Sequence, residues 1–135
     1  NAFKSLNGTT DRIEKVDTSI AGLAYGSVRN VVFYGNTFNG IGQVTQNPVT
    51  LELDQATEAD VWTLDAGPCL PFGGRAREVV SVVPEGEVTD VLAMPVFSMP
   101  YATTEVGAAR LEVTLTWPEP VKGRAVVTVR VDKPV

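Results

Sequence analysis

Residues 110–132 read RLEVTLTWPEPVKGRAVVTVRVD, and this stretch decides the fold of the chain. Apolar and polar residues alternate along it, as in a strand with one buried face and one solvated face. The apolar set comprises Leu111, Val113, Leu115 and Trp117, then Ala125, Val127, Val129 and Val131. The link at 118–123 contains two prolines and a glycine, so it predicts an antiparallel hairpin between the two halves.

The same alternation recurs upstream in several short segments that are separated by turn residues. Asn39-Gly40, between the first two of these segments, predicts a tight type I′ turn. Many short strands at regular spacing predict an all-β fold, which is an antiparallel sandwich, a jelly roll or a small barrel. The expected strands are residues 28–38, 41–45, 49–54, 61–64, 78–83 and 88–99, the last interrupted by Pro95.

The first part of the chain has a different pattern. We expect residues 1–26 to form a short N-terminal helix or an extended arm, and residues 27–135 to form the β domain. Asp11 and Glu14 have the spacing of a capping box, in which each side chain satisfies a free amide at a helix start. Four apolar residues would lie on one stripe of this helix: Ile13, Val16, Ile20 and Leu23. This stripe either packs on the β domain or contacts a neighbouring subunit.

Residue types that carry chemistry are scarce. The 135 residues include no histidine and a single cysteine, Cys69. Without histidine the chain lacks the usual base near neutral pH and the usual partner of a nucleophile. One thiol can form neither an intrachain disulfide nor a cysteine zinc site. We therefore expect no enzymatic activity, no cofactor and no metal.

The net charge is −5, and much of it comes from residues 51–65, which contain no base. The basic residues are scattered along the chain, so the clustered basic face of a nucleic-acid-binding protein is not expected. No apolar run reaches the length of a membrane span. Two interpretations fit the acids of this stretch: they supply the carboxylate pair of a glycosidase, or they lie on the solvated face of a strand. We favour the solvated face. The acids are Glu52, Asp54, Glu58, Asp60 and Asp65.

Residues 94–101, MPVFSMPY, combine large apolar side chains with two prolines. Proline cannot donate a ladder hydrogen bond, so this segment suits a sheet edge or a connection. Phe97, Met99 and Tyr101 then either fold into the core or are covered by a partner. With the N-terminal stripe, they form the expected assembly interface.

A polar N-terminal segment at 11–23 followed by β patterning to Val131 resembles small virion proteins of tailed phages. These are the capsid decoration proteins and the heads of short fibres, in which an arm or short coiled segment precedes a compact β barrel, commonly as a trimer. The resemblance implies a non-catalytic virion protein that self-associates and attaches to other virion or surface proteins. A virion or extracellular location would follow.

The alternative from another class is a ligand- or carbohydrate-binding β sandwich of a surface or secreted protein. Such a module presents exposed aromatic rings as stacking platforms. The candidate rings are those of Tyr25, Tyr34, Trp62 and Tyr101.

Overall fold

The computed structural model of the chain describes residues 1–14, 29–72 and 75–134, and their fold is all-β. The only helical element among them is a single 3₁₀ turn, η2 (Gly67–Cys69), so no helix there is long and apolar enough to cross a membrane. The strands are β1 (Ala2–Lys4), β2 (Thr37–Asn39), β3 (Val49–Asp65), β4 (Glu78–Pro84), β5 (Thr89–Asp90), β6 (Tyr101–Val106) and β7 (Glu112–Arg130).

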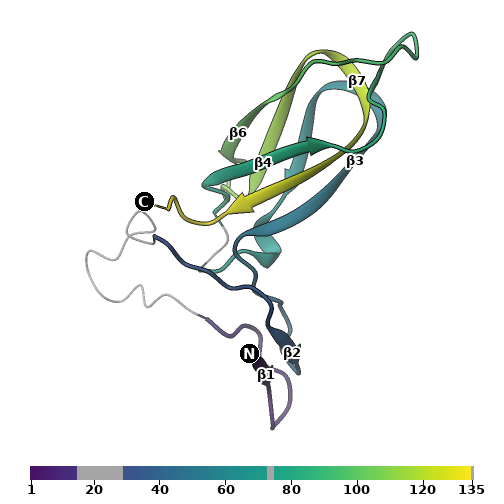
Figure 1. The fold of residues 1–135 in the computed structure, drawn as a ribbon. Helices are drawn as coiled ribbons and strands as arrows, with labels where there is room; N and C mark the ends of the chain where they lie inside the picture. The colour runs from purple at the N-terminus through teal and green to yellow at the C-terminus, as the bar shows by residue number, and fades with distance from the viewer. Residues whose placement is uncertain (15–28, 73–74, 135) are drawn as a thin grey trace.

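Strand β7 organises the main antiparallel sheet. It pairs with β3 along one side and with β4, β5 and β6 in turn along the other (Figure 1). The predicted hairpin within 110–132 is therefore wrong, because its two halves belong to one strand and each pairs with β3. Pro118 and Pro120 are tolerated because residues 117–120 have no ladder partner among the described strands.

The β3–β7 ladder bends in its middle, which makes the fold sandwich-like. In Figure 1, β7 bends at the end of the molecule opposite the C-terminus. Leu53 lies opposite Ala125 before the bend, and Trp62 lies opposite Leu115 after it, with register shifts between Gln55 and Val61. These shifts move the buried positions of β3 from odd to even numbers, while those of β7 remain odd.

A single apolar core lies between the two halves of the bent ladder. The predicted alternation is confirmed over 113–131, since Val113, Leu115, Val127 and Val129 are fully buried. It is wrong at Asp132, which we expected on the solvated face and which is fully buried. Residues 49–54 and 78–83 also form strands as expected. The Trp62 and Trp117 rings pack with their centroids 4.9 Å apart.

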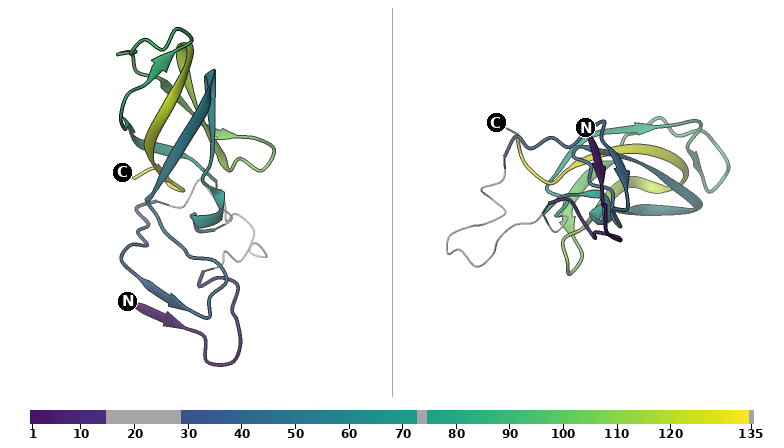
Figure 2. Two further views of the ribbon diagram at one scale, coloured as in Figure 1. Left: turned by 90° about the vertical axis from the view of Figure 1, so that its right-hand side faces the viewer. Right: turned by 90° about the horizontal axis from the view of Figure 1, so that it is seen from below.

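The predicted hairpin around Asn39-Gly40 is wrong. Of the expected strand 28–38, the described residues form a strand only at Thr37 and Phe38, which belong to β2 and pair in parallel with β1 (Figure 2), and an isolated bridge at Phe33. Gly40 has a φ of +70°, but Asn39 does not have the positive φ that a type I′ turn requires. Instead, Asn39 O and Gly40 O accept hydrogen bonds from the backbone amides of Ser5 and Thr10. The N-terminal segment has replaced the expected return strand.

The predicted helix start at Asp11 and Glu14 is also wrong, because residues 11–14 are not helical. Glu14 accepts hydrogen bonds from Arg12 Nε at 2.7 Å and from Thr45 Oγ1 at 2.5 Å, instead of capping its own backbone. Arg12 in turn donates to Leu70 O at 2.7 Å. Hydrogen bonds to residues distant in the sequence have therefore formed in place of the local helix cap. The rest of the expected helix and the expected boundary at residue 26 lie outside the described residues.

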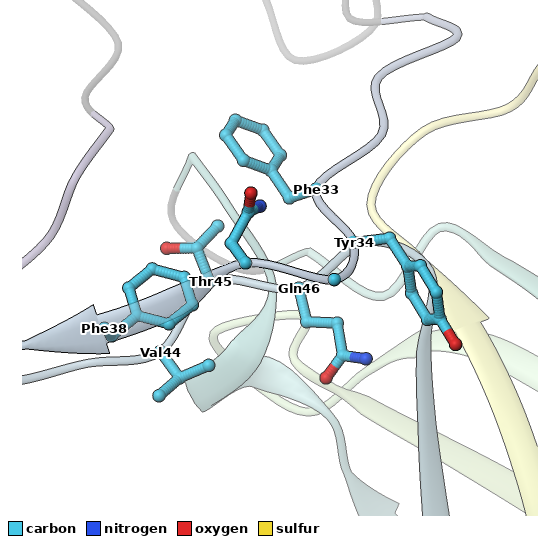
Figure 3. A pocket seen from close by; sticks show the side chains of 8 residues that line it. Phe33, Tyr34, Phe38, Val44, Thr45 and Gln46 are labelled. Atoms are coloured by element: carbon cyan, nitrogen blue, oxygen red, sulfur yellow. The ribbon is translucent and has the colours of Figure 1, made fainter. Parts of the chain in front are cut away.

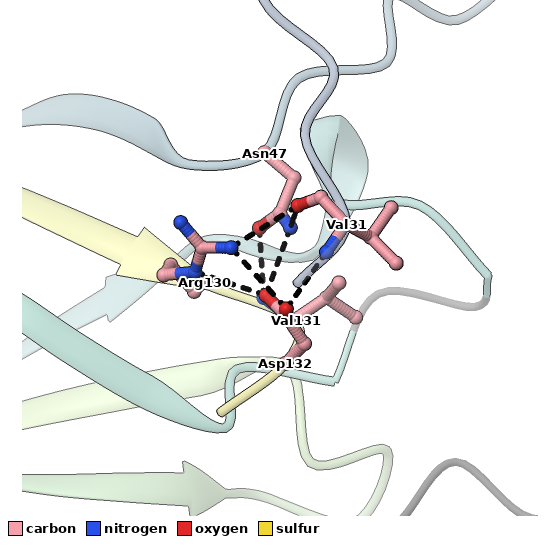
Figure 4. Close-up of polar contacts among 5 residues, drawn as sticks. All are labelled: Val31, Asn47, Arg130, Val131 and Asp132. Atoms are coloured by element: carbon pink, nitrogen blue, oxygen red, sulfur yellow. Dashed lines mark hydrogen bonds and ion pairs between the residues drawn. The ribbon is translucent and has the colours of Figure 1, made fainter. Parts of the chain in front are cut away.

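A buried carboxylate connects the N-terminal part of the chain to the end of β7 (Figure 4). Asp132 is fully buried and accepts hydrogen bonds from Arg130 Nε at 2.9 Å, Asn47 Nδ2 at 3.0 Å and Val31 N at 3.0 Å. Asn47 Oδ1 also accepts a hydrogen bond from Val131 N. Burial raises the pKa of Asp132, but these donors lower it by more, so the net pKa lies below the usual value.

Asp132→Asn should lower the free energy of unfolding by about 3 kcal/mol at neutral pH, because it leaves the half-buried Arg130 without its carboxylate. The depressed pKa means that this contribution is complete above the unfolded-state pKa of about 3.9 and is lost as the pH falls through the lower folded-state pKa. Urea unfolding of the wild type and of Asp132→Asn over a series of acid pH values measures the difference in their free energies of unfolding. This difference should narrow as the pH falls.

Asp60→Asn is the matched control, because it makes the same change in charge at an exposed position. It should shift the free energy of unfolding by less than about 0.5 kcal/mol. Equal effects of the two substitutions, or a difference that stays constant with pH, would contradict the stabilising role of Asp132.

Candidate interaction surfaces

The acidic residues of 51–65 lie on the solvated face of β3, as we favoured from the sequence. All five acids are exposed, and two of them pair with bases on β7. Glu52 pairs with Arg124, and Glu58 Oε1 lies 2.9 Å from Lys122 Nζ. The hydrogen bond from Lys122 lowers the pKa of Glu58. Within the described ranges, no group of three or more acids and cysteines is placed to hold a metal ion.

Large apolar side chains are concentrated instead on the connection between β5 and β6 and on the first residue of β6. Phe97 is 94% exposed and Leu92 is 77% exposed, and the others are more than half exposed. Figure 1 shows this connection, in green after β4, reaching the tip of the molecule opposite both termini. We call this set the apolar ridge: Val91, Leu92, Met94, Phe97, Met99 and Tyr101.

Backbone and side-chain hydrogen bonds fix the turn at the top of the ridge. Asp90 Oδ1 accepts hydrogen bonds from Leu92 N at 2.8 Å and from Met94 N at 2.9 Å. Asp90 N donates to Met94 O at 2.9 Å, and Ala93 takes a positive φ of 59°. This side-chain-capped turn is typical of aspartate. It replaces most of the strand that we expected over 88–99.

Beyond the turn, the chain is laid out with a period of two. Phe97, Met99 and Tyr101 point to solvent, while Val96 packs against the core and Ser98 is half-buried. Val96 N donates to Val88 O at 2.8 Å, which fixes the phase of this alternation. The alternative that these three side chains fold into the core is therefore wrong for the isolated chain.

A pocket of about 220 Å³ lies beside the ridge. Val88, Val96 and Met99 are among its lining residues, and Trp117 also lines it. The indole Nε1 of Trp117 is buried and has no hydrogen-bond partner within the described ranges, whereas Trp62 Nε1 donates to Ala59 O and Val121 O. The ridge therefore combines projecting apolar side chains with an adjacent apolar hollow.

A second pocket, of about 280 Å³, lies in the N-terminal part of the molecule (Figure 3). Aromatic and amide side chains line it, with Phe38 and Val44 on one side and Tyr34 on the other. The Gln46 side chain extends between Val44 and Tyr34. No sequence pattern indicated this pocket, because it requires 33–38 and 44–46 to meet without the hairpin that we expected.

Of the residues predicted for an assembly interface, Phe97, Met99 and Tyr101 come together on the ridge. Ile13 is half-buried, and the other three members of the N-terminal stripe, Val16, Ile20 and Leu23, lie outside the described residues. Sequence reasoning missed Val91 and Leu92, although an aspartate followed by a short apolar run was a signal for the turn that exposes them. Met94 lay in the segment 94–101 that the sequence singled out, but it was not named for the interface.

The predicted stacking platforms have different outcomes. Trp62 is fully buried and is excluded as a platform, because its period-two phase changes at the bulge in β3. Tyr34 and Tyr101 are 72% and 66% exposed, the first at the N-terminal pocket and the second on the ridge. Tyr25 lies outside the described residues.

No protein-family model, curated protein sequence or solved structure matches this chain.

Phe97→Ala should change the free energy of unfolding by less than about 0.5 kcal/mol, since the side chain is exposed and contributes little to the core. Leu115→Ala, at a fully buried position, should cost about 2–5 kcal/mol. Denaturant unfolding of the two variants measures both values at a concentration where the protein is monomeric. A cost for Phe97→Ala approaching that for Leu115→Ala would mean that Phe97 belongs to the core.

Proposed function

We propose that this protein is a non-catalytic assembly protein that associates with further copies of itself, most simply as a trimer, through the apolar ridge. The observation that carries the proposal is the run of large exposed side chains over 91–101, headed by Phe97. Contiguous exposed apolar surface on a folded protein marks an interaction site, because leaving it in water is costly.

The ordered backbone beneath the ridge supports the proposal. The turn at Asp90 and the bond from Val96 N to Val88 O fix where the side chains project, so little conformational entropy is lost when a partner covers them. Phenylalanine, methionine and tyrosine are also the residue types that are enriched at protein interfaces.

The occupant that fits best is a second copy of the chain. Phe97 projects at the rim of a hollow that it lines together with Val88, Val96 and Trp117. Each copy therefore offers both a projecting ring and an adjacent, mainly apolar hollow. The ridge lies at one tip of the molecule, and three such tips can therefore meet around a threefold axis.

The setting that we propose is a virion, in which the trimer decorates a capsid or forms the head of a short fibre. Its support is the layout of a polar N-terminal segment before a β domain, together with the position of the ridge opposite the N-terminus. With the ridge used for self-association, the N-terminal segment is free to attach to other virion proteins.

Sedimentation equilibrium of the full chain at tens of micromolar should give an oligomer, with a trimer expected. The double variant Phe97→Ser/Met99→Ser should shift it to monomer, because it removes two apolar side chains from the ridge and leaves the core intact.

Val32→Ser is the control, since Val32 is 65% exposed and lies outside the ridge. This variant should retain the wild-type mass. A wild-type chain that is monomeric at these concentrations, or an oligomer that survives the double substitution, would overturn the assignment of the ridge as a self-association surface.

A further inference from the structure

The pocket in the N-terminal part of the molecule combines aromatic rings with amides, and none of the described residues that line it is charged. We propose that it binds one pyranose ring of a neutral glycan, a function that is independent of assembly through the ridge. An aromatic face packs against the C–H face of a sugar ring, and amides pair with its hydroxyl groups. A lining without charge disfavours phosphorylated or carboxylated ligands, which require basic partners.

Backbone pairing places the first two groups of the site. Phe33 and Asn47 form an isolated antiparallel bridge, with N–H···O distances of 3.0 Å in both directions. The neighbouring residues, Tyr34 and Gln46, therefore face each other across these two segments of the chain. Figure 3 shows the Gln46 side chain beside the Tyr34 ring. Because Tyr34 is 72% exposed, its ring is available for stacking.

The amides of the pocket are uncommitted. Asn36 and Gln46 are half-buried, and in the described parts of the chain neither side-chain amide forms a hydrogen bond. Each amide offers both a donor and an acceptor, as two neighbouring hydroxyl groups of a sugar require. Half-buried amides that lack partners gain more from such a ligand than fully solvated ones.

The walls of the pocket are held in place without the ligand. Asn47, next to Gln46, is anchored by Asp132 and Val131, as Figure 4 shows. Phe38 stacks on Phe3 with ring centroids 5.7 Å apart. A preformed site loses less conformational entropy when the ligand binds, because its groups are already ordered. Its volume of about 280 Å³ is just below the usual range for ligand pockets, which suits a single ring with the rest of the glycan in solvent.

Saturation-transfer NMR of the full chain with millimolar methyl glucoside, galactoside, mannoside and N-acetylglucosaminide tests the proposal. At least one of these probes should give a signal, and its affinity should fall about tenfold or more in Tyr34→Ala, because the stacking face is lost. Gln46→Ala is the second variant, and it should also weaken binding without loss of the fold.

Tyr101→Ala is the matched control, since it removes a similarly exposed tyrosine from the ridge, and it should bind the probe within twofold of wild type. This variant also separates the two proposals, because it changes the assembly surface and leaves the sugar pocket intact. No signal with any of the four probes, or an affinity unchanged in both pocket variants, would overturn the sugar site.

Discussion

The bent pairing of β3 with β7 is the constraint on which the rest of this structure depends. Both strands are long, and both change direction where register shifts interrupt the ladder between Gln55 and Val61. Because one pair of strands contributes to both layers, the two layers share one continuous core that includes Trp62 and Trp117. The remaining strands of the main sheet only extend β7 along its other side. The β3–β7 ladder therefore sets where the other strands of the main sheet lie and how the core is packed.

The sequence predicted what depends on local patterning. The fold class, the buried face of 110–132 and the strand at 49–54 follow from alternation, because period-two burial is a property of each strand by itself. The strand at 78–83 follows instead from its four valines, a residue type that favours strands. The pairing partners did not follow. The prolines at 118 and 120 indicate a change of direction equally well for a hairpin and for a bend between two layers, and only the distant strand β3 decides between them.

The candidate sites show the same division. Phe97, Met99 and Tyr101 could be named from the sequence because prolines flank them, but whether they face the core or solvent depended on the bond between Val96 and Val88. The pocket beside Tyr34 was beyond sequence reasoning, since it forms where the N-terminal segment takes the place of a predicted strand. The residues that bring distant segments together could not be recognised from the sequence, where Glu14 has the spacing of a helix cap and Asp132 looks like an ordinary surface acid.

The dominance of β7 also bears on the order in which the chain can fold during synthesis. Every pairing of the main sheet joins an earlier segment to residues 112–130, and Val49 finds its partner Val129 eighty residues later. While a ribosome is still producing β7, the apolar residues of β3 and β4 lack the strand against which they pack. Loop closure over such separations is slow, and exposed strands invite aggregation until it occurs. The main sheet therefore cannot form until β7 has emerged from the ribosome.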